Sequence, residues 1–167
     1  MRERMPERAM PKDLTLSIRA YRHDDLDAVI AIFLGAIRQI AARDYNQAQI
    51  DAWAQADRDA WTVRRLDRPT WVAIIGETIV GFADLEADGH LDMMFVDPAH
   101  QRMGVASALY ETIETHARMQ GLHEISTEAS ITARPFFERR GFSVLSAQLV
   151  EKRGQILKNF RMKKILR

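Results

Sequence analysis

The chain has 167 residues, of which 47% are hydrophobic and 28% are charged, a composition typical of one globular domain. It contains no cysteine, which excludes a disulfide framework, a thiolate zinc site, an iron–sulfur cluster and a cysteine nucleophile. Because 24 Lys and Arg residues nearly balance 23 Asp and Glu residues, the net charge of +1 argues against nucleic acid as the main partner.

The N-terminal residues lack the features of a targeting or membrane segment. Residues 1–13 alternate Arg, Glu and Pro without an apolar core, so we expect a flexible leader rather than a signal peptide. No apolar stretch approaches the ~20 residues that span a bilayer. We therefore expect a soluble cytoplasmic protein without a membrane partner, in which residues 14–167 fold as one domain.

The first part of the chain predicts one strand and then helices. Apolar and polar residues alternate over residues 14–19, which indicates a strand. Apolar residues then recur at helical spacing from Leu26, with Asp24 as the expected N-cap. Two further helices are expected, one from the cap Asn46 to residue 54 and one over residues 57–66.

The apolar period changes to that of strands after Pro69. Asp88 and Gly89 are expected to occupy the two positive-φ positions of a tight hairpin turn, which places Ala83 opposite Met94. The strand after this turn is almost continuously apolar, which is typical of a strand buried on both faces. The three strands expected here cover residues 71–75, 79–86 and 91–96.

The last part of the chain predicts alternating helices and strands. Helices are expected over residues 104–120 and 133–140, and strands over residues 124–129, 142–150 and 156–163. The complete order predicts an α+β fold: a single mixed, mostly antiparallel sheet with helices on both faces.

The segment that carries chemistry is the loop before the long helix at residue 104. Its backbone N–H groups and the helix dipole would suit a phosphate, and Gly104 and Ala106 would let a pyrophosphate approach the backbone. An ordinary strand-to-helix turn fits the spacing equally well. The sequence has neither a P-loop pattern nor a three-glycine dinucleotide fingerprint.

At this point the chain resembles the GNAT superfamily of N-acetyltransferases. The family's pyrophosphate loop reads Gln or Arg, two variable residues, Gly, one variable residue, then Gly or Ala, and residues 101–106 match every fixed position. Residues 91–98 resemble the family's central strand and its exit, and residues 133–142 resemble a later segment that ends in Gly-Phe. The resemblance covers the chain from about residue 14 to its end, and it implies the GNAT fold.

The resemblance also implies acetyl-CoA as the donor and a set of residues that hold it. Backbone amides of the loop would bind the pyrophosphate, and the central strand would pair with the pantetheine arm and stabilise the thioester oxygen. Arg102 adds a charge-assisted contact to phosphate or is a solvated surface arginine. The implied cofactor-binding residues are Met94, Phe95, Val96, Gln101, Arg102, Met103, Gly104, Val105, Ala106, Ser107, Ser130, Ala133, Phe136 and Phe137.

Two positions depart from the family pattern. Phe137 stands where the family often has a tyrosine that protonates the departing thiolate, and Ser130 stands where it often has an asparagine. A phenyl ring donates no proton, but thiols have pKa values near ~8.5, so the thiolate leaves without a dedicated acid. Water, Ser130 or Tyr45 would then supply the proton.

An amine acceptor must lose a proton, so a general base is expected. Asp92 lies within an apolar run, where desolvation would raise its pKa, and it is the first candidate. His90, two residues away, is the alternative base. Asp92 equally fits an ion pair with an arginine, and His90 equally fits a residue that only follows the turn. Glu86, Glu128 and water are the remaining candidates.

The acceptor pocket is expected among the first helices and the last strands. Candidate substrate-binding residues are Tyr45, Trp53 and Glu86, with Trp61 as a further wall, although a Trp at helical spacing is more often in the core. The five histidines show no metal-binding spacing, so no metal site is expected. A homodimer through the end strands is suggested by analogy.

Three functions remain open at this stage. The first is direct transfer of an acetyl group from acetyl-CoA to a primary amine of a small molecule or peptide. The second, motivated by Phe137, is a non-catalytic regulatory module that binds CoA or acyl-CoA without turnover. The third is an interaction protein that never binds CoA.

Overall fold

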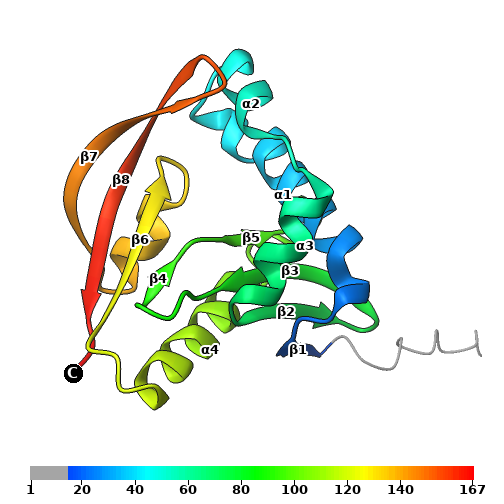
Figure 1. The fold of residues 1–167 in the computed structure, drawn as a ribbon, viewed down its shortest axis with the longest axis vertical. Coiled ribbons are helices and arrows are strands. Elements are labelled where there is room, and N and C mark those ends of the chain that lie inside the picture. Colours follow the sequence, from blue (N-terminus) through cyan, green and yellow to red (C-terminus); the bar gives the residue numbers. More distant parts are fainter. Residues whose placement is uncertain (1–14) are drawn as a thin grey trace, which may run out of the picture.

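The computed structural model describes residues 15–167, and the expected leader, residues 1–13, lies outside the described residues. Helices and strands fall close to the positions that the sequence predicts (Figure 1). The helices are α1 (Leu26–Gln39), α2 (Gln47–Trp53), α3 (Arg58–Asp67), α4 (Val105–Met119) and α5 (Arg134–Arg139). The strands are β1 (Leu16–Ala20), β2 (Thr70–Ile75), β3 (Thr78–Asp84), β4 (His90–Leu91), β5 (Met94–Val96), β6 (Glu124–Ser130), β7 (Ser143–Lys152) and β8 (Gln155–Ile165).

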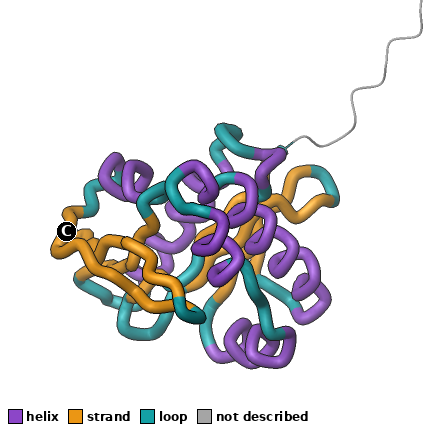
Figure 2. The backbone as a smooth tube through the Cα atoms, turned by 90° about the horizontal axis from the view of Figure 1, so that it is seen from above, coloured by secondary structure: helices purple, strands orange, loops and turns teal. Residues whose placement is uncertain are grey.

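The α+β fold class is confirmed, with mixed, mostly antiparallel strands and helices on both faces. The strands form two four-stranded sheets, ordered β1-β2-β3-β5 and β4-β6-β8-β7, where the sequence predicts one. The expected continuous strand over residues 91–96 is interrupted, so its first part pairs in parallel with β6 and its second part pairs with β3. Viewed from above, the C-terminal strands lie to one side of the helix-covered first sheet (Figure 2).

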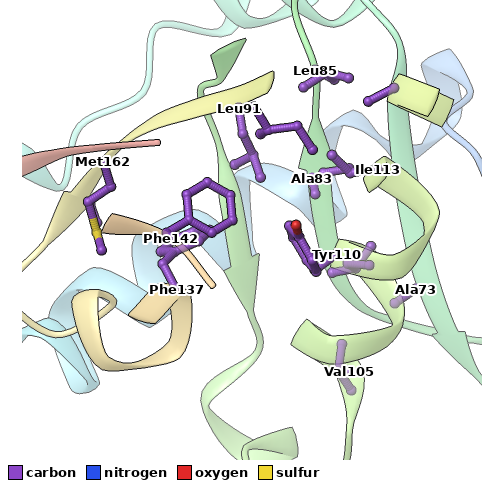
Figure 3. Packing of buried hydrophobic residues seen from close by; sticks show 14 of the residues in the cluster. Ala73, Ala83, Leu85, Leu91, Val105, Tyr110, Ile113, Phe137, Phe142 and Met162 are labelled. Carbon is purple, nitrogen blue, oxygen red and sulfur yellow. The ribbon is translucent and has the colours of Figure 1, made fainter. Parts of the chain in front are cut away.

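The two faces of the first sheet bury different side chains. On β2 and β3, Val72 and Phe82 pack toward α1, whereas their neighbours Ala73 and Ala83 pack toward α4. This follows from the alternation of side chains along a strand. The α4 side continues under the second sheet, so Phe137 and Phe142 belong to the same core as Tyr110 (Figure 3).

The hairpin before β4 differs from the expected tight turn. Gly89 has φ +92°, but Asp88 is not among the residues with positive φ, and the N–H of Gly89 donates to the carbonyl of Glu86 at 2.9 Å. The turn is therefore longer than two residues. The N–H of Glu86 donates to the carbonyl of His90, which shifts the register by one residue. The break between β4 and β5 shifts it back, so the expected pairing of Ala83 with Met94 is confirmed.

The entry to α1 also differs from the sequence expectation, which makes Asp24 the cap. A short 3-10 turn precedes the helix, and the Asp25 carboxylate, 7% exposed, binds the guanidinium of Arg19 at 2.7 and 2.9 Å. The N–H of Arg22 donates to the same carboxylate at 2.8 Å. Asp25 thus ties β1 to the start of the helix.

This ion pair predicts a loss of stability in acid. The hydrogen bond from Arg19 lowers the pKa of Asp25 below its usual 3.8, so the stabilisation is complete above that value and is lost as the pH falls through the folded-state pKa. We expect Asp25→Asn to lower the free energy of unfolding by about 2 kcal/mol at pH 7, the range for charge-assisted hydrogen bonds. Urea unfolding at pH 7 and pH 3 checks this, since the difference from the wild type must shrink in acid.

Candidate functional site

The loop before α4 is shaped by two residues in the left-handed backbone region. Arg102 has φ +60°, and Gly104, the N-cap of α4, has φ +79°. The amide group of Gln101 donates to the carbonyls of Val96 and Asp97 at 3.2 and 3.3 Å, which anchors the loop to the exit of β5. The backbone N–H groups of the first turn have no partner within the helix, and no acidic side chain lies in that turn.

Gly104 is favoured here by backbone conformation and not by lack of space. A positive φ disfavours residues with a side chain, and a Cβ built at this position would have no atom within 4 Å. The space in front of the helix N-terminus is therefore open. An open helix N-terminus with unpaired N–H groups attracts an anion.

A cavity of about 400 Å³ begins at this loop and runs along β5 toward α5. Three arginines, Arg43, Arg102 and Arg139, contribute to its lining, and no Asp or Glu does so among the described residues. This charge balance fits a polyanionic ligand such as a coenzyme with several phosphates.

The structure brings thirteen of the fourteen predicted cofactor-binding residues together around this cavity. The exception is Met103, which is 53% exposed and lines neither this cavity nor the second one described below. The residues that line it as expected are Met94, Phe95, Val96, Gln101, Arg102, Gly104, Val105, Ala106, Ser107, Ser130, Ala133, Phe136 and Phe137.

Strand β5 presents an open edge to this region. It pairs with β3 on one side only. The N–H groups of Asp84 and Asp97 donate to the carbonyls of Met93 and Val80, which shows that every second residue of β5 points its backbone groups toward β3. In that alternation Phe95 points its backbone groups toward β3, so the N–H groups of Met94 and Val96 point away from β3. An extended ligand could therefore hydrogen-bond to the free edge.

The break between β4 and β5 is held by a carboxylate that the sequence analysis did not identify. Asp84 is fully buried, and its Oδ1 accepts hydrogen bonds from the N–H groups of Asp92 and Met93 at 3.1 and 2.8 Å. These two amides are thereby withdrawn from a regular ladder. The carboxylate thus turns one predicted strand into two and sets the position of β5.

Two arginines surround this carboxylate. Arg65 of α3, also fully buried, donates to Oδ2 of Asp84 at 2.8 Å. Arg68 lies 3.8 Å from Asp84, 2.9 Å from Glu86 and 3.3 Å from Asp92. Burial raises the pKa of Asp84, and the charge of Arg65 opposes that rise. One side of the site therefore depends on a buried charge network.

A second cavity, of about 390 Å³, meets the first. Its lining contains acidic and basic side chains from α3 and its N-cap, from the break between β4 and β5, from β6 and from the end of the β7–β8 hairpin. A donor substrate in the first cavity and an acceptor in the second would therefore meet at a common wall. The residues that line both cavities are Trp53, Met94, Phe95, Ser130, Ala133 and Phe137.

The candidate bases occupy different places. Asp92 lines the second cavity, but its side chain is 35% exposed and paired with Arg68, so the expected desolvated carboxylate is not found. His90 and Glu86 line neither cavity, which argues against His90 as base and Glu86 as a substrate contact. His90 Nδ1 lies 3.1 Å from the hydroxyl of Ser126, and Glu86 binds Arg68. Glu128 lines the second cavity.

Tyr45 lines the second cavity, but its hydroxyl is already engaged. It donates to the carbonyl of Lys158 at 2.5 Å and accepts from the N–H of Ile131 at 3.0 Å. Burial raises the pKa of Tyr45, which makes it a weaker acid. Tyr45 is therefore a link between the helices and the second sheet, and a poor proton donor.

The remaining aromatic candidates separate into pocket and core. Trp53 is partly exposed and lines both cavities, as expected for a substrate wall. Trp61 is 4% exposed and packs against Phe33 at a ring distance of 4.8 Å, so most of its surface belongs to the core. Tyr110 lines neither cavity, and burial raises its pKa.

Phe137, which stands where the family often has a tyrosine, packs into the hydrophobic core. Phe137 is 3% exposed and packs against Phe142 with ring centroids 5.1 Å apart. Among the six residues of the common wall, Ser130 carries the hydroxyl, which accepts a hydrogen bond from the N–H of Ala133 at 3.0 Å. The Ser130 hydroxyl proton is not used by that bond, so Ser130 remains able to donate one.

Other kinds of site find no support within residues 15–167. No group of three or more His, Asp or Glu side chains converges there as a metal site would require. Among those residues, no helix is long and apolar enough to cross a membrane.

Comparison with known proteins gives consistent matches along almost the whole chain. Residues 41–166 match the family model for an acetyltransferase (GNAT) domain. The chain is 40% identical over 148 residues to the uncharacterized N-acetyltransferase YafP of Escherichia coli (strain K12), which covers 89% of this chain and 95% of that protein.

Two solved structures superpose well. A GCN5-related N-acetyltransferase from Rhodopseudomonas palustris is 32% identical, with a TM-score of 0.88 over 92% of this chain and 98% of that one. The PaiA N-acetyltransferase of Thermoplasma acidophilum, in complex with coenzyme A, is 19% identical, with a TM-score of 0.71 over 91% and 99% of the two chains. At that identity the second match shows the fold alone.

Proposed function

Because this chain belongs to the GNAT family of N-acetyltransferases, we propose that it transfers the acetyl group of acetyl-CoA directly to a primary amine. The observation that carries this proposal is the meeting of two cavities at one wall. The first cavity has an open helix N-terminus, a free strand edge and three arginines. The second has the carboxylates that an amine requires.

The first cavity offers contacts for successive parts of acetyl-CoA. Backbone N–H groups at the start of α4 would bind the pyrophosphate, and Arg102 and Arg139 would contact phosphate oxygens. The pantetheine arm would hydrogen-bond to the free edge of β5 at Met94 and Val96. Its thioester would then reach the wall that the two cavities share.

The transfer needs only groups that line the two cavities. The amine nitrogen attacks the thioester carbonyl carbon, the new C–N bond forms, and the C–S bond breaks as the sulfur leaves. A proton passes from the amine to a base, which releases it to water, and the thiolate takes a proton from water or from Ser130, whose hydroxyl is then reprotonated by water. Since the chain has no cysteine, no thiol is present to form an acyl-enzyme, and direct attack is the simpler path.

We propose Asp92 as the base and Glu128 as a contact for the amine. Both carboxylates line the second cavity, and Asp92 lies two residues before Met94 on the common wall. Arg68 is shared among Asp92, Asp84 and Glu86, so it does not neutralise Asp92 alone. Substitution of Asp92 should therefore change kcat, and substitution of Glu128 should change KM.

We expect Asp92→Asn to lower kcat more than tenfold without changing acetyl-CoA affinity, because a base acts only during the reaction. Glu128→Gln should mainly raise KM for the amine. Release of CoA, followed with a thiol reagent, measures both, and the cysteine-free chain adds no background. If Glu128→Gln, rather than Asp92→Asn, removes the acid limb of the kcat–pH profile, the two roles are exchanged.

The alternative is a GNAT-fold regulatory module that binds CoA or acyl-CoA without turnover. It is favoured by Phe137, which places a phenyl ring where the family often has an acidic hydroxyl. This alternative predicts acetyl-CoA binding with no acceptor-dependent release of CoA. The small-molecule or peptide acceptor, a homodimer and a cytoplasmic location all stay predictions.

A further inference from the structure

Asn159 of β8 lines the second cavity, and one of its side-chain atoms is a hydrogen-bond acceptor without a donor. Oδ1 of Asn159, on β8, is inaccessible to solvent and has no hydrogen-bond partner among the described residues. Asn159 lies directly opposite Ser130 of β6, which belongs to the wall shared by the two cavities. A buried carbonyl without a donor is unfavourable unless a ligand supplies an N–H or O–H group.

A second unpaired acceptor lies beside it. Glu128 precedes Ser130 by two residues on β6, so it is a diagonal neighbour of Asn159, about 7–8 Å away between Cα atoms. Within residues 15–167 Glu128 forms no hydrogen bond or ion pair, even with Arg161 opposite it on β8. Glu128 is exposed, so water hydrates its carboxylate, and both this carboxylate and the Asn159 oxygen are free of protein donors among the described residues. The two acceptors together suit an amine or ammonium group.

The other end of the second cavity is lined by cations. Lys152 and Arg153 occupy the end of the β7–β8 hairpin, and Arg64 lies on α3. In the part of the chain that the structure describes, Lys152 and Arg64 form no ion pair, and Arg153 donates only to the carbonyl of Ala52 at 2.6 Å. These three cations would attract an anion.

The remaining charged residues of this cavity have partners within the protein. Asp57 caps α3 by accepting from the N–H of Ala60 at 3.0 Å, and Asp92 pairs with Arg68. The unpaired charges are therefore separated, with Glu128 near the common wall and the cations at the hairpin. Lys152 pairs with Gln155, which lies four residues along β8 from Asn159, roughly 13 Å at 3.3 Å per residue.

We propose that the acceptor is a small amino carboxylate, a molecule with a primary amine at one end and a carboxylate at the other. Asn159 and Glu128 bind the amine beside the thioester, and Lys152 with Arg153 and Arg64 binds the carboxylate. This inference rests on the proposed acetyl transfer and specifies the molecule that receives the acetyl group.

Three amines of equal chain length test the preference for a carboxylate. 6-Aminohexanoate, hexylamine and 1,6-diaminohexane differ only in the group at the far end. We expect kcat/KM for 6-aminohexanoate to exceed that for the other two at least tenfold. Lys152→Glu should reverse the order in favour of the diamine. Lys158→Glu is the matched control, because this exposed lysine of the same hairpin does not line the cavity.

Asn159→Leu separates binding from a structural role without using activity. Leucine has nearly the same shape and removes the unpaired oxygen, so the free protein should become as stable as the wild type or more stable. Calorimetric titration with 6-aminohexanoate in the presence of CoA should show at least tenfold weaker binding. A purely structural Asn159 would instead lose stability on substitution and leave binding unchanged.

The outcomes distinguish this inference from the function on which it rests. If all three amines release CoA at similar rates and Lys152→Glu changes nothing, acetyl transfer stands and the amino carboxylate proposal is wrong. If a blocked lysine peptide is a better acceptor than 6-aminohexanoate, the acceptor is a protein and the proposal is likewise wrong. If no amine releases CoA although acetyl-CoA binds, the proposed transferase function fails first.

Discussion

Replacing Arg65 with methionine should lower the free energy of unfolding by about 3–5 kcal/mol, because it leaves the buried Asp84 carboxylate without its main cation. Asp84 cannot move to solvent, since its Oδ1 holds the N–H groups of Asp92 and Met93. Methionine fills most of the space of the arginine stem, so loss of charge rather than a cavity causes the effect. Urea unfolding at pH 7 measures it.

The pH dependence of unfolding tests whether the Asp84 charge causes the loss of stability in Arg65→Met. Burial already raises the pKa of Asp84, and removal of Arg65 removes a charge that opposes this rise. Because the folded-state pKa of Asp84 is raised, the free energy of unfolding of the variant is closest to that of the wild type in acid, and it falls as the pH rises through that pKa. The deficit of Arg65→Met relative to the wild type should therefore be smaller at pH 4 than at pH 7.

Two further variants control this prediction. Arg64→Met changes the preceding, exposed arginine of α3 and should alter stability by less than about 0.5 kcal/mol. Adding Asp84→Asn to Arg65→Met removes the unpaired charge but keeps an acceptor for the two amides, so it should recover more than about 1 kcal/mol. A deficit below about 1 kcal/mol for Arg65→Met would contradict the network as described.

Gly104→Glu should abolish the stabilisation that acetyl-CoA confers on the protein. For the wild type, a ligand at ~100 times its Kd adds about 2.7 kcal/mol, or roughly 5–10 °C in Tm for a chain of this size. The variant places a carboxylate at the open N-terminus of α4, where we propose that the pyrophosphate binds. Thermal unfolding with and without acetyl-CoA measures the shift.

The chain offers a closely matched control at the other end of the same helix. Gly121 has φ +73°, and a Cβ there would also have no atom within 4 Å. Gly121→Glu and Gly104→Glu should each cost about 1–2 kcal/mol because both force a side chain into the left-handed region. Only Gly104→Glu should lose the shift with acetyl-CoA. An unchanged shift in that variant would show that the loop binds no phosphate.

The donor side of the site could be predicted from local sequence because its parts are contiguous. A glycine before an amphipathic helix, following an apolar strand, fixes a loop and a helix N-terminus within a few residues of each other. Thirteen of the fourteen residues that the family resemblance implies line one cavity. Met103 is the exception because its side chain is exposed to solvent.

The acceptor side depends on contacts between distant segments, and local spacing could not supply them. Asp92 meets Arg68, which lies 24 residues earlier in the chain. The prediction for His90 places it on the same strand face as Asp92, and the interruption at Asp92 and Met93 breaks the alternation that this requires. A side chain two residues from another then no longer shares its face.

One signal for the buried ion pair was present in the sequence. Arg65 follows the buried Trp61 by four residues, so it lies on the apolar face of its helix. Asp84 follows the buried Phe82 by two residues along β3, so it lies on the same face of the strand. A cation and an anion that both replace apolar residues in buried patterns predict each other as partners.

The free edge of β5 has a consequence for how the protein moves. Met94 and Val96 point backbone N–H groups away from the ladder, whereas β2 is paired with a strand on each side. In hydrogen–deuterium exchange we therefore expect the amides of Met94 and Val96 to exchange quickly in the free protein and those of β2 slowly. The core under α4 is shared by the two sheets, and a bound extended ligand would act as an additional strand along the free edge of β5. Slow exchange along β5 would then report the occupied state before any chemistry occurs.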